Sequence, residues 1–238
     1  RYLVENDLFF LAAEVLSDGQ VIHSDTGKRF LWHQFYVDMC RQTELQIAAG
    51  GGLDSSSRGA SKSTIRTKAG NIQRMIRYPN STGCIFSFQR KSSRKHFLGI
   101  KEELETNEVL RTVCDDIFYW DPRSAAKNGE TTWAKDEGLR VKRRPGVVYR
   151  ENTLEYNAFF DGTPTGGRYD WLDFDDIEDD KAIGTEEMIE KLHKTYDTTM
   201  FVLTAREIKP PVMMFTNTFY HDGALAHRVY KQLLDESE

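Results

Sequence analysis

A stretch of small residues at 55–64 (SSSRGASKST) constrains the fold more than any other segment. It lies between a short apolar, Gly-rich run at 45–52 (LQIAAGGG) and a segment compatible with a helix at 64–78 (TIRTKAGNIQRMIRY). A strand, a tight loop, a Lys-Ser/Thr pair and a helix form the layout of a phosphate-binding loop. Small residues let backbone N–H groups turn towards phosphate oxygens, and the helix N-terminus adds positive charge. The layout predicts that Lys62 reaches terminal phosphates and that the Ser63 hydroxyl binds Mg²⁺.

The loop departs from the usual pattern at two positions. Ser61 and Ser56 stand where glycines directly before the Lys and five positions earlier are expected. A solvated Ser-rich linker is the alternative interpretation of this stretch alone. The predicted nucleotide-binding residues of the loop are Ser57, Arg58, Gly59, Ala60, Ser61, Lys62, Ser63 and Thr64.

Composition limits the class of protein. The 238 residues, 39% of them hydrophobic, suit one large domain, which we take as 1–238 with an N-terminal helical segment at 1–44. No apolar run is long enough to span a membrane, and the opening residues lack the layout of a signal peptide. Because the chain does not begin with Met, we expect a processed chain or a fragment. Three widely spaced cysteines favour a reducing compartment with buried thiols.

Strand and helix patterns alternate along the chain. Strands are expected at 82–88, 138–144, 153–160, 169–174 and 212–218, and helices at 5–16, 30–44, 64–78, 92–105, 109–118, 185–205 and 222–236. Residues 120–133 are broken by Pro, Gly and Asn and predict a surface excursion. The alternation predicts an α/β fold with a largely parallel central sheet flanked by helices.

Acidic residues follow the strand expected at 169–174. An ATPase needs acids at the end of a second strand, to hold Mg²⁺ and to orient the attacking water. Asp175 is predicted as the Mg²⁺-side acid, Asp176 as the water-orienting base, and Glu178 as a substitute base. Asp173 is unusual inside such a strand. The alternative for the whole segment is a solvated acidic loop.

The segment before the loop contains a candidate for the nucleobase. Gln34 could contact adenine by hydrogen bonds, and the Trp32 ring could stack on it. The alternative is that the aromatic residues around Trp32 belong to the core.

Three motifs in this order resemble one known family. SRGASKST, TGGRYDWLDFDDIED and MMFTNTFYHDGALAHRVYKQL resemble the phosphate loop, the Gly-Arg loop with paired acids and the third motif of the tailed-bacteriophage large terminases. The resemblance covers most of the chain and corresponds to the ATPase domain of these DNA-packaging motors. It implies a P-loop NTPase of the additional-strand (ASCE) class. The nuclease domain of the family would follow the third motif, so no nuclease activity is expected here.

The resemblance also implies roles for individual residues. Arg58 would act on the γ-phosphate from within the loop. Thr216, Asn217 and Thr218 would form a coupling motif, for which a polar strand-to-helix turn is the alternative. Arg168 would be an arginine finger inserted into a neighbouring subunit. Its rivals for that role are Arg140, Arg143 and Arg144, and a surface Arg paired with nearby acids is equally open for each.

The implied function is ATP-driven translocation of double-stranded DNA into a procapsid. ATP and Mg²⁺ would be required, and the partners would be double-stranded DNA, the portal or procapsid, the small terminase subunit and further copies in a ring. No membrane is implied, and the location would be the host cell cytoplasm. Lys91, Arg94 and Lys95, or the strand from Arg140 to Arg144, are candidates for DNA contact. A helicase-like P-loop motor and a nucleic-acid-binding assembly module with an inactive nucleotide site are the alternatives.

Overall fold

The fold is organised by one mixed sheet. A computed structural model describes residues 1–22, 24, 27–57, 59–134, 136, 138–161, 166–178, 184–217 and 225–235. The seven-stranded sheet has the order β1–β7–β6–β2–β5–β4–β3. Its parallel part comprises β1 (Gly51–Asp54), β7 (Val212–Thr216), β6 (Trp171–Asp175), β2 (Gly83–Ser87) and β5 (Leu154–Ala158). The short strands β4 (Gly138–Leu139) and β3 (Trp133–Ala134) extend it antiparallel. The predicted α/β class with a largely parallel sheet is confirmed.

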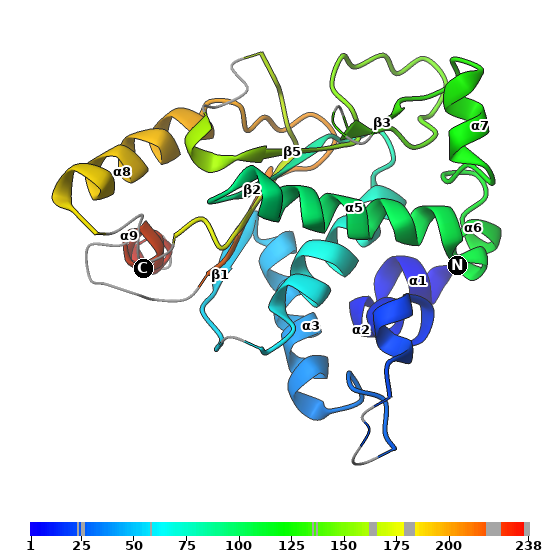
Figure 1. The fold of residues 1–238 in the computed structure, drawn as a ribbon, viewed down its shortest axis with the longest axis horizontal. Helices are drawn as coiled ribbons and strands as arrows, with labels where there is room; N and C mark the ends of the chain where they lie inside the picture. Colours follow the sequence, from blue (N-terminus) through cyan, green and yellow to red (C-terminus); the bar gives the residue numbers. More distant parts are fainter. Residues whose placement is uncertain are drawn as a thin grey trace.

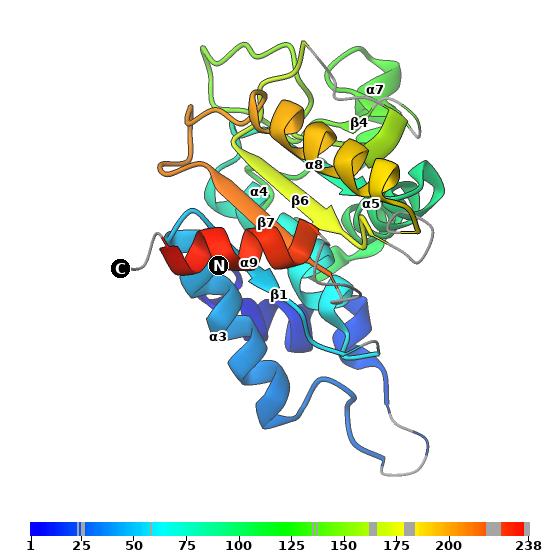
Figure 2. The ribbon, with the colours of Figure 1, turned by 90° about the vertical axis from the view of Figure 1, so that its left-hand side faces the viewer.

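Helices cover both faces of the sheet (Figures 1 and 2). One face carries α3 (Gln34–Ala48), the π-helical segment η3 (Ser63–Ala69) continued by α4 (Gly70–Arg77), and α5 (Arg90–Thr106). The other face carries α8 (Glu186–Met200) and α9 (Leu225–Asp235). The N-terminal helices α1 (Tyr2–Asn6), α2 (Leu8–Phe10), η1 (Leu11–Val15) and η2 (Ser17–Gln20) form a further layer, packed on α3, η3 and α4.

Alternate residues of the strands belong to two separate hydrophobic cores, one on each face of the sheet. On β2, Ile85 belongs to the core on the side of α5, whereas Phe86 belongs to the core on the other face. There Phe86 stacks on Phe174, and Phe174 stacks on Phe215 with ring centroids 4.5 Å apart. Because both faces of the parallel strands are buried, the strands read as short apolar runs in the sequence. This is why the sequence locates β2, β6 and β7 closely.

The strand before the small-residue loop differs from expectation. Leu45–Ala48 continues α3, and the strand is β1, Gly51–Asp54, so the run at 45–52 is not itself that strand. The buried residues Met39, Thr43 and Ile47 repeat every four positions, which keeps one apolar stripe on α3 up to its last turn. The helix also begins later than predicted, at Gln34.

The other corrections concern element ends. The helix predicted at 109–118 is shorter, α6 (Glu108–Val113), and the helix predicted at 185–205 ends at Met200. Only Gly138–Leu139 of the strand predicted at 138–144 pairs with neighbours.

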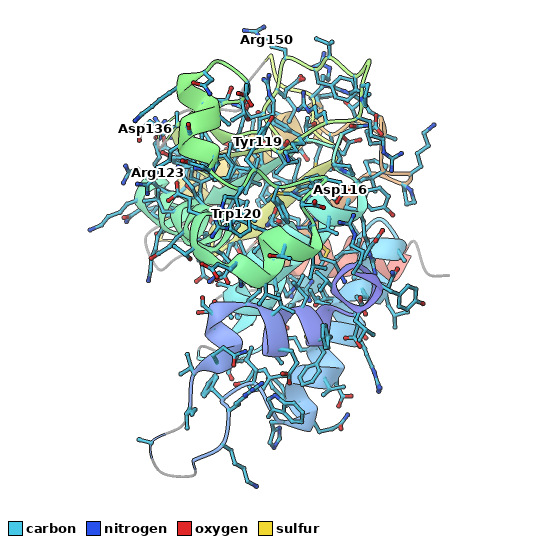
Figure 3. The ribbon with its side chains drawn as sticks, turned by 90° about the vertical axis from the view of Figure 1, so that its right-hand side faces the viewer. Asp116, Tyr119, Trp120, Arg123, Asp136 and Arg150 are labelled. Carbon is cyan, nitrogen blue, oxygen red and sulfur yellow. The ribbon has the colours of Figure 1, made fainter. Side chains whose placement is uncertain are left out.

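The surface excursion predicted at 120–133 contains a short helix, α7 (Pro122–Lys127). A single helical turn, η4 (Phe159–Asp161), follows β5. Figure 3 shows Tyr119, Trp120 and Arg123 on the side of the molecule that carries α7. Trp120 is 60% exposed, and the Arg111 guanidinium carbon lies 4.6 Å from the centre of its ring.

Glu105 of α5 is held ionised by three donors. Burial opposes its ionisation, but hydrogen bonds from Arg123, Lys101 and Trp133 lower its pKa to about 2.

The acid inside β6 is buried rather than pointing outward. Asp173 accepts hydrogen bonds from Arg74 and Asn71 of α4, and the Arg74 guanidinium lies 5.4 Å from the centre of the Trp171 ring. Burial raises the pKa of Asp173 and lowers that of Arg74. The charge is therefore tolerated because a cation from the covering helix pairs with it.

No helix in the ranges given above has the length and hydropathy needed to span a bilayer.

Candidate nucleotide site

A cavity lies at the carboxyl ends of the parallel strands. Asp54 of β1, Thr216 of β7 and Asp175 of β6 stand side by side in the sheet register at this edge. Open α/β sheets bind ligands at this edge. The cavity has a volume of about 490 Å³ and is lined by Gly59, Ala60, Ser61, Lys62, Ser63, Thr64, Phe88, Gln89, Ser92, Asp176 and Glu178. Most of the predicted loop residues thus lie together with two of the predicted acids.

The loop itself turns through left-handed backbone conformations. Gly59 has a φ of 84° and Ser61 a φ of 54°. Ser61 stands where the usual pattern has glycine, so the backbone keeps a glycine-like conformation although a serine occupies the position. The missing glycine therefore does not prevent the tight turn before Lys62.

The start of the loop is fixed by Asp54. Its carboxylate accepts hydrogen bonds from the Ser56 amide at 2.7 Å and from the Ser56 hydroxyl at 2.5 Å. Arg66 of η3 lies 3.5 Å from the same carboxylate and also donates to Gln46 of α3 at 2.5 Å. Burial lowers the pKa of Arg66 to about 10. A buried charged pair thus anchors both ends of the loop to the sheet and to α3.

Lys62 connects the loop to the strand that carries the predicted coupling motif. The side chain is only 8% exposed. Its Nζ donates to the Ser56 carbonyl at 2.6 Å and to the Asn217 carbonyl at 3.1 Å. Two motifs separated by more than half of the chain therefore meet at one ammonium group.

The predicted metal ligands also meet. The Ser63 hydroxyl donates to Asp175 Oδ1 at 3.0 Å, and Thr67 donates to Asp175 Oδ2. His96 of α5 places Nε2 at 3.7 Å from the same Oδ2. Asp175 is 1% exposed. A hydroxyl next to a carboxylate is the oxygen donor set that Mg²⁺ uses when phosphates and water supply its remaining ligands.

Two buried polar atoms that lack partners in the described part of the chain lie at the same edge of the sheet. The buried Ser87 hydroxyl ends β2, and the buried Asn217 side-chain oxygen follows β7; neither has a hydrogen-bond partner among the described residues. Buried polar atoms are normally paired, so these two fit a polar ligand at this edge, while other described atoms that are buried without a partner, such as Arg74 Nε and Asp173 Oδ1, lie in the core between β6 and α4.

Asp176 and Glu178 occupy different environments. Asp176 lines the cavity, is exposed, and has a φ of 47°, a left-handed conformation that Asp tolerates better than most residues. Glu178 is buried and accepts hydrogen bonds from Asn217 Nδ2 at 2.5 Å, from the Leu225 amide, and from the Ala226 amide at 3.2 Å. Burial raises the pKa of Glu178 although these donors oppose the shift. Glu178 thus ties Asn217, directly after β7, to the first turn of α9.

Replacing Glu178 by Ala is expected to lower the free energy of unfolding by about 3 kcal/mol, since buried unsatisfied donors cost roughly 1–3 kcal/mol each and part of the loss is relieved by water. Glu178→Gln keeps one acceptor oxygen and is expected to lose less than half as much. Urea unfolding of both variants measures the difference. An unchanged urea midpoint in Glu178→Ala would contradict the role assigned to this carboxylate.

A second cavity of about 510 Å³ flanks the loop from the side of α3. Its walls include Phe35, Met39, Gln42, Leu53 and Arg66. Gln34 and Trp32, the nucleobase candidates, line neither cavity. Gln34 is exposed and donates to Asp38 at 2.8 Å, while Trp32 packs edge-on against Phe9.

The candidate arginines lie in different settings. Arg168 is exposed at the amino end of β6, the opposite edge of the sheet from the cavity, and donates to the Gly167 carbonyl. Arg143 donates to the carbonyls of Tyr149 and Glu151, and burial lowers its pKa to about 10. Arg140 donates to the Arg150 carbonyl at 3.3 Å, and Arg144 is exposed. Arg58 and Thr218 lie outside the described residues, and Ser57 is exposed beside the cavity-lining part of the loop.

Sequence patterns alone miss several residues at the site. Phe88, Gln89 and Ser92 line the cavity from the turn between β2 and α5, and Thr67 and His96 contact Asp175. The available signal is that 82–88 is itself a predicted parallel strand, whose carboxyl end must reach the same edge of the sheet.

Comparison with known protein families and with curated protein sequences finds no match.

Proposed function

We propose that this chain is an ATP-hydrolysing motor domain of the large-terminase type, which drives double-stranded DNA into a procapsid. The observation that carries the proposal is the meeting of three predicted motifs at one cavity edge. Lys62 Nζ lies 3.1 Å from the Asn217 carbonyl, and Ser63 Oγ lies 3.0 Å from Asp175 Oδ1. A Ser-rich linker and a solvated acidic loop would have no reason to meet in this way.

The strand order supports the additional-strand class of P-loop NTPase. The loop follows β1 and the acids follow β6, and β7 lies between these two strands. An extra strand between the loop strand and the acid strand is the arrangement that the class name describes. The proposed coupling residues therefore stand between the phosphate loop and the acids.

The chain's own groups would bind and orient a nucleoside triphosphate. The left-handed turn at Gly59 and Ser61 leads directly into η3, and residues 59–64 line the cavity, so loop amides and the helix N-terminus would bind phosphate oxygens there. Lys62 would exchange a carbonyl partner for phosphate oxygens and stabilise charge on the transferring group.

Ser63 and Asp175 are the residues that would hold Mg²⁺. Among the described residues no cluster of three or more His, Cys, Asp or Glu could hold a metal ion. A site that shares Mg²⁺ with substrate phosphates needs only one or two carboxylates, so the donor set fits such a site. When bound, Mg²⁺ would neutralise the phosphate charge; Thr67 and His96 would hold the Asp175 carboxylate in place.

Asp176 is the proposed water-orienting group. Asp176 and Glu178 both line the cavity, but Asp176 is exposed, whereas the Glu178 carboxylate accepts hydrogen bonds from Asn217 and from the first turn of α9. Gln89 also lines the cavity, and its side-chain amide would be available to hold the same attacking water.

Asn217 links the site to α9. Its carbonyl accepts from Lys62, and its side chain donates to Glu178, which in turn accepts from the first amides of α9. If Lys62 moves towards a phosphate, its contact with Asn217 changes, and the support of α9 changes with it. Thr216 and Thr218 would complete this coupling motif, with Arg58 acting within the loop and Arg168 reaching a neighbouring subunit of a ring.

The test is ATP hydrolysis by the whole chain with Mg²⁺, with and without double-stranded DNA of arbitrary sequence. Stimulation by DNA, lost in Asp175→Ala, is the expected result. A rate of ATP hydrolysis that is the same with and without DNA would favour the interpretation as another kind of P-loop enzyme. Absence of nucleotide binding would overturn the proposal and leave the assembly module as the better interpretation.

A further inference from the structure

The outer face of α5 carries charge in an unusual arrangement. Arg90, Lys91, Arg94 and Lys95 fall in the first six residues of the helix, and the first turn contains no acid. Cations at a helix N-terminus oppose the helix dipole, so helix stability does not favour this placement. Acids Glu102, Glu103 and Glu105 occupy the C-terminal half instead. The arrangement therefore calls for a reason outside the helix itself.

The cations lie on the solvent side of α5. Lys91, Arg94, Lys95 and Leu98 follow one another at helical spacing, whereas Phe97, Ile100 and Leu104 are buried against the sheet. Lys91 and Lys95 are exposed, and in the described ranges neither has a carboxylate or ring partner. Arg94 pairs with the exposed Asp136 at 3.2 Å, and Arg90 lies 5.7 Å from the Tyr156 ring.

A hollow of about 580 Å³ accompanies this basic face, lined by Lys91, Ser92, Arg94, Lys95, Leu98 and Gly99, with Glu102 at its far end. A Cβ added at Gly99 would meet no atom within 4 Å, so this chain has room for a side chain there. Glycine is a poor residue for a helix interior. The bare backbone at Gly99 permits close approach of a ligand instead.

The basic face adjoins the nucleotide cavity. Ser92 lines both the hollow and the cavity, and Gln89, which precedes α5, lines the cavity as well. Figure 1 shows α5 leaving the end of β2 and running across the sheet towards α6. A polyanion bound along α5 would thus extend to the edge of the nucleotide cavity, because the first turn of α5 borders both.

We propose that the basic face of α5, formed by Arg90, Lys91, Arg94 and Lys95 with the hollow at Gly99, binds the phosphate backbone of double-stranded DNA. Nucleic-acid interfaces are polar and strongly cationic, whereas sites for protein partners are centred on aromatic or apolar anchors. On this face Leu98 is the one large apolar residue of the hollow, and it is partly buried. The choice of DNA among nucleic acids rests on the function proposed above.

The rival basic segment is less available. The guanidinium groups of Arg140 and Arg143 already donate hydrogen bonds to the carbonyls of residues 149–151. Phosphate contact there would break these bonds, whereas Lys91 and Lys95 would give up no contact within the described part of the chain.

Fluorescence anisotropy with a labelled 30-bp duplex of arbitrary sequence tests the inference. The charge-reversed variant Lys91→Glu/Lys95→Glu is compared with Lys127→Glu/Lys194→Glu, which changes the net charge equally on the exposed surfaces of α7 and α8. The α5 variant is expected to bind at least tenfold more weakly, and the slope of log K against log salt should fall by about 2, close to one per phosphate contact. The control variant is expected to stay within threefold of the unsubstituted chain.

A third variant, Gly99→Leu, fills the hollow without changing charge. It is expected to weaken duplex binding several-fold while the thermal unfolding midpoint stays equal or rises. Equal loss of binding in the α5 and control variants, or no loss in either, would overturn the inference. Displacement of the duplex by polyglutamate at equal charge concentration would also overturn it, in favour of an acidic protein partner.

The same preparations are titrated with Mg-ATP, which separates this inference from the proposed function. Duplex binding that depends on Lys91 and Lys95 in a chain that binds no nucleotide would support the surface and contradict the motor. Nucleotide binding with duplex affinity insensitive to these lysines would contradict the surface alone.

Discussion

Replacing Lys62 by Ala is expected to slow Mg²⁺-dependent ATP hydrolysis about 100-fold or more, the usual effect of removing one group that stabilises transition-state charge. The side chain is nearly buried at the cavity, and its ammonium group joins the loop to Asn217. Alanine removes both the charge and this link. Steady-state hydrolysis measured at saturating Mg-ATP reports the loss of the chemical step.

Lys194→Ala provides the matched control, because Lys194 is an exposed lysine on α8, which covers the opposite face of the sheet from η3. It is expected to hydrolyse ATP at the unsubstituted rate. The Lys62 variant should still fold, since it loses two hydrogen bonds to carbonyls that together contribute about 1–3 kcal/mol. Equal rates of ATP hydrolysis in Lys62→Ala and Lys194→Ala would contradict the catalytic role proposed for Lys62.

The second large effect is expected from Arg74→Met. The Arg74 guanidinium and the Asp173 carboxylate are both buried and joined directly, with Asn71 as a further donor to the carboxylate. Removing one partner of a buried ion pair typically costs about 3–5 kcal/mol, because the remaining charge has no compensation. Urea unfolding at pH 7 should show a loss of this size. The exposed pair Arg228–Asp197 is the control, where Arg228→Met should cost less than about 1 kcal/mol.

The loss should also depend on pH. Burial already raises the pKa of Asp173 above its ordinary value of 3.8, and Arg74 is the main group that opposes this. A raised carboxyl pKa means that the folded state keeps a proton that the unfolded state has released. The free energy of unfolding therefore falls as pH rises through that window, and in Arg74→Met it should be lower at pH 7 than at pH 5.

A double variant separates charge from packing. Arg74→Met/Asp173→Leu removes both charges and is expected to recover most of the stability, because apolar replacements of buried pairs are often neutral. A double variant no more stable than Arg74→Met, or a single variant that loses less than about 1 kcal/mol, would contradict this description of the core.

Local patterns in the sequence predict the strands better than their arrangement. The apolar runs at 82–88, 169–174 and 212–218 mark β2, β6 and β7 because both faces of these strands are buried. No pattern reports that β7 lies between β1 and β6, since strand order depends on packing between distant segments. The sequence does not locate the boundary between α3 and β1, because Leu45–Ala48 is apolar enough for either element. The segment is helical because Ile47 continues the buried stripe formed by Met39 and Thr43.

The same contrast between local patterns and packing of distant segments applies to the candidate site. The loop and the acids could be predicted because each is a local pattern next to a strand end. The pairing of Asp173 with Arg74 could not, because a helix from another part of the chain supplies the partner. The same holds for Phe88, Gln89 and Ser92, whose position depends on β2 lying beside β6. The role of Glu178 depends on α9, which follows it by almost fifty positions.

Calorimetric titration of the chain with ATP, in Mg²⁺ and in EDTA, tests most directly whether the three strand ends form one nucleotide site. Mg²⁺ is expected to strengthen ATP binding at least tenfold in the unsubstituted chain and by less than threefold in Asp175→Ala. Binding of ATP that is equal in Mg²⁺ and EDTA, or unaffected by Asp175→Ala, would contradict the account.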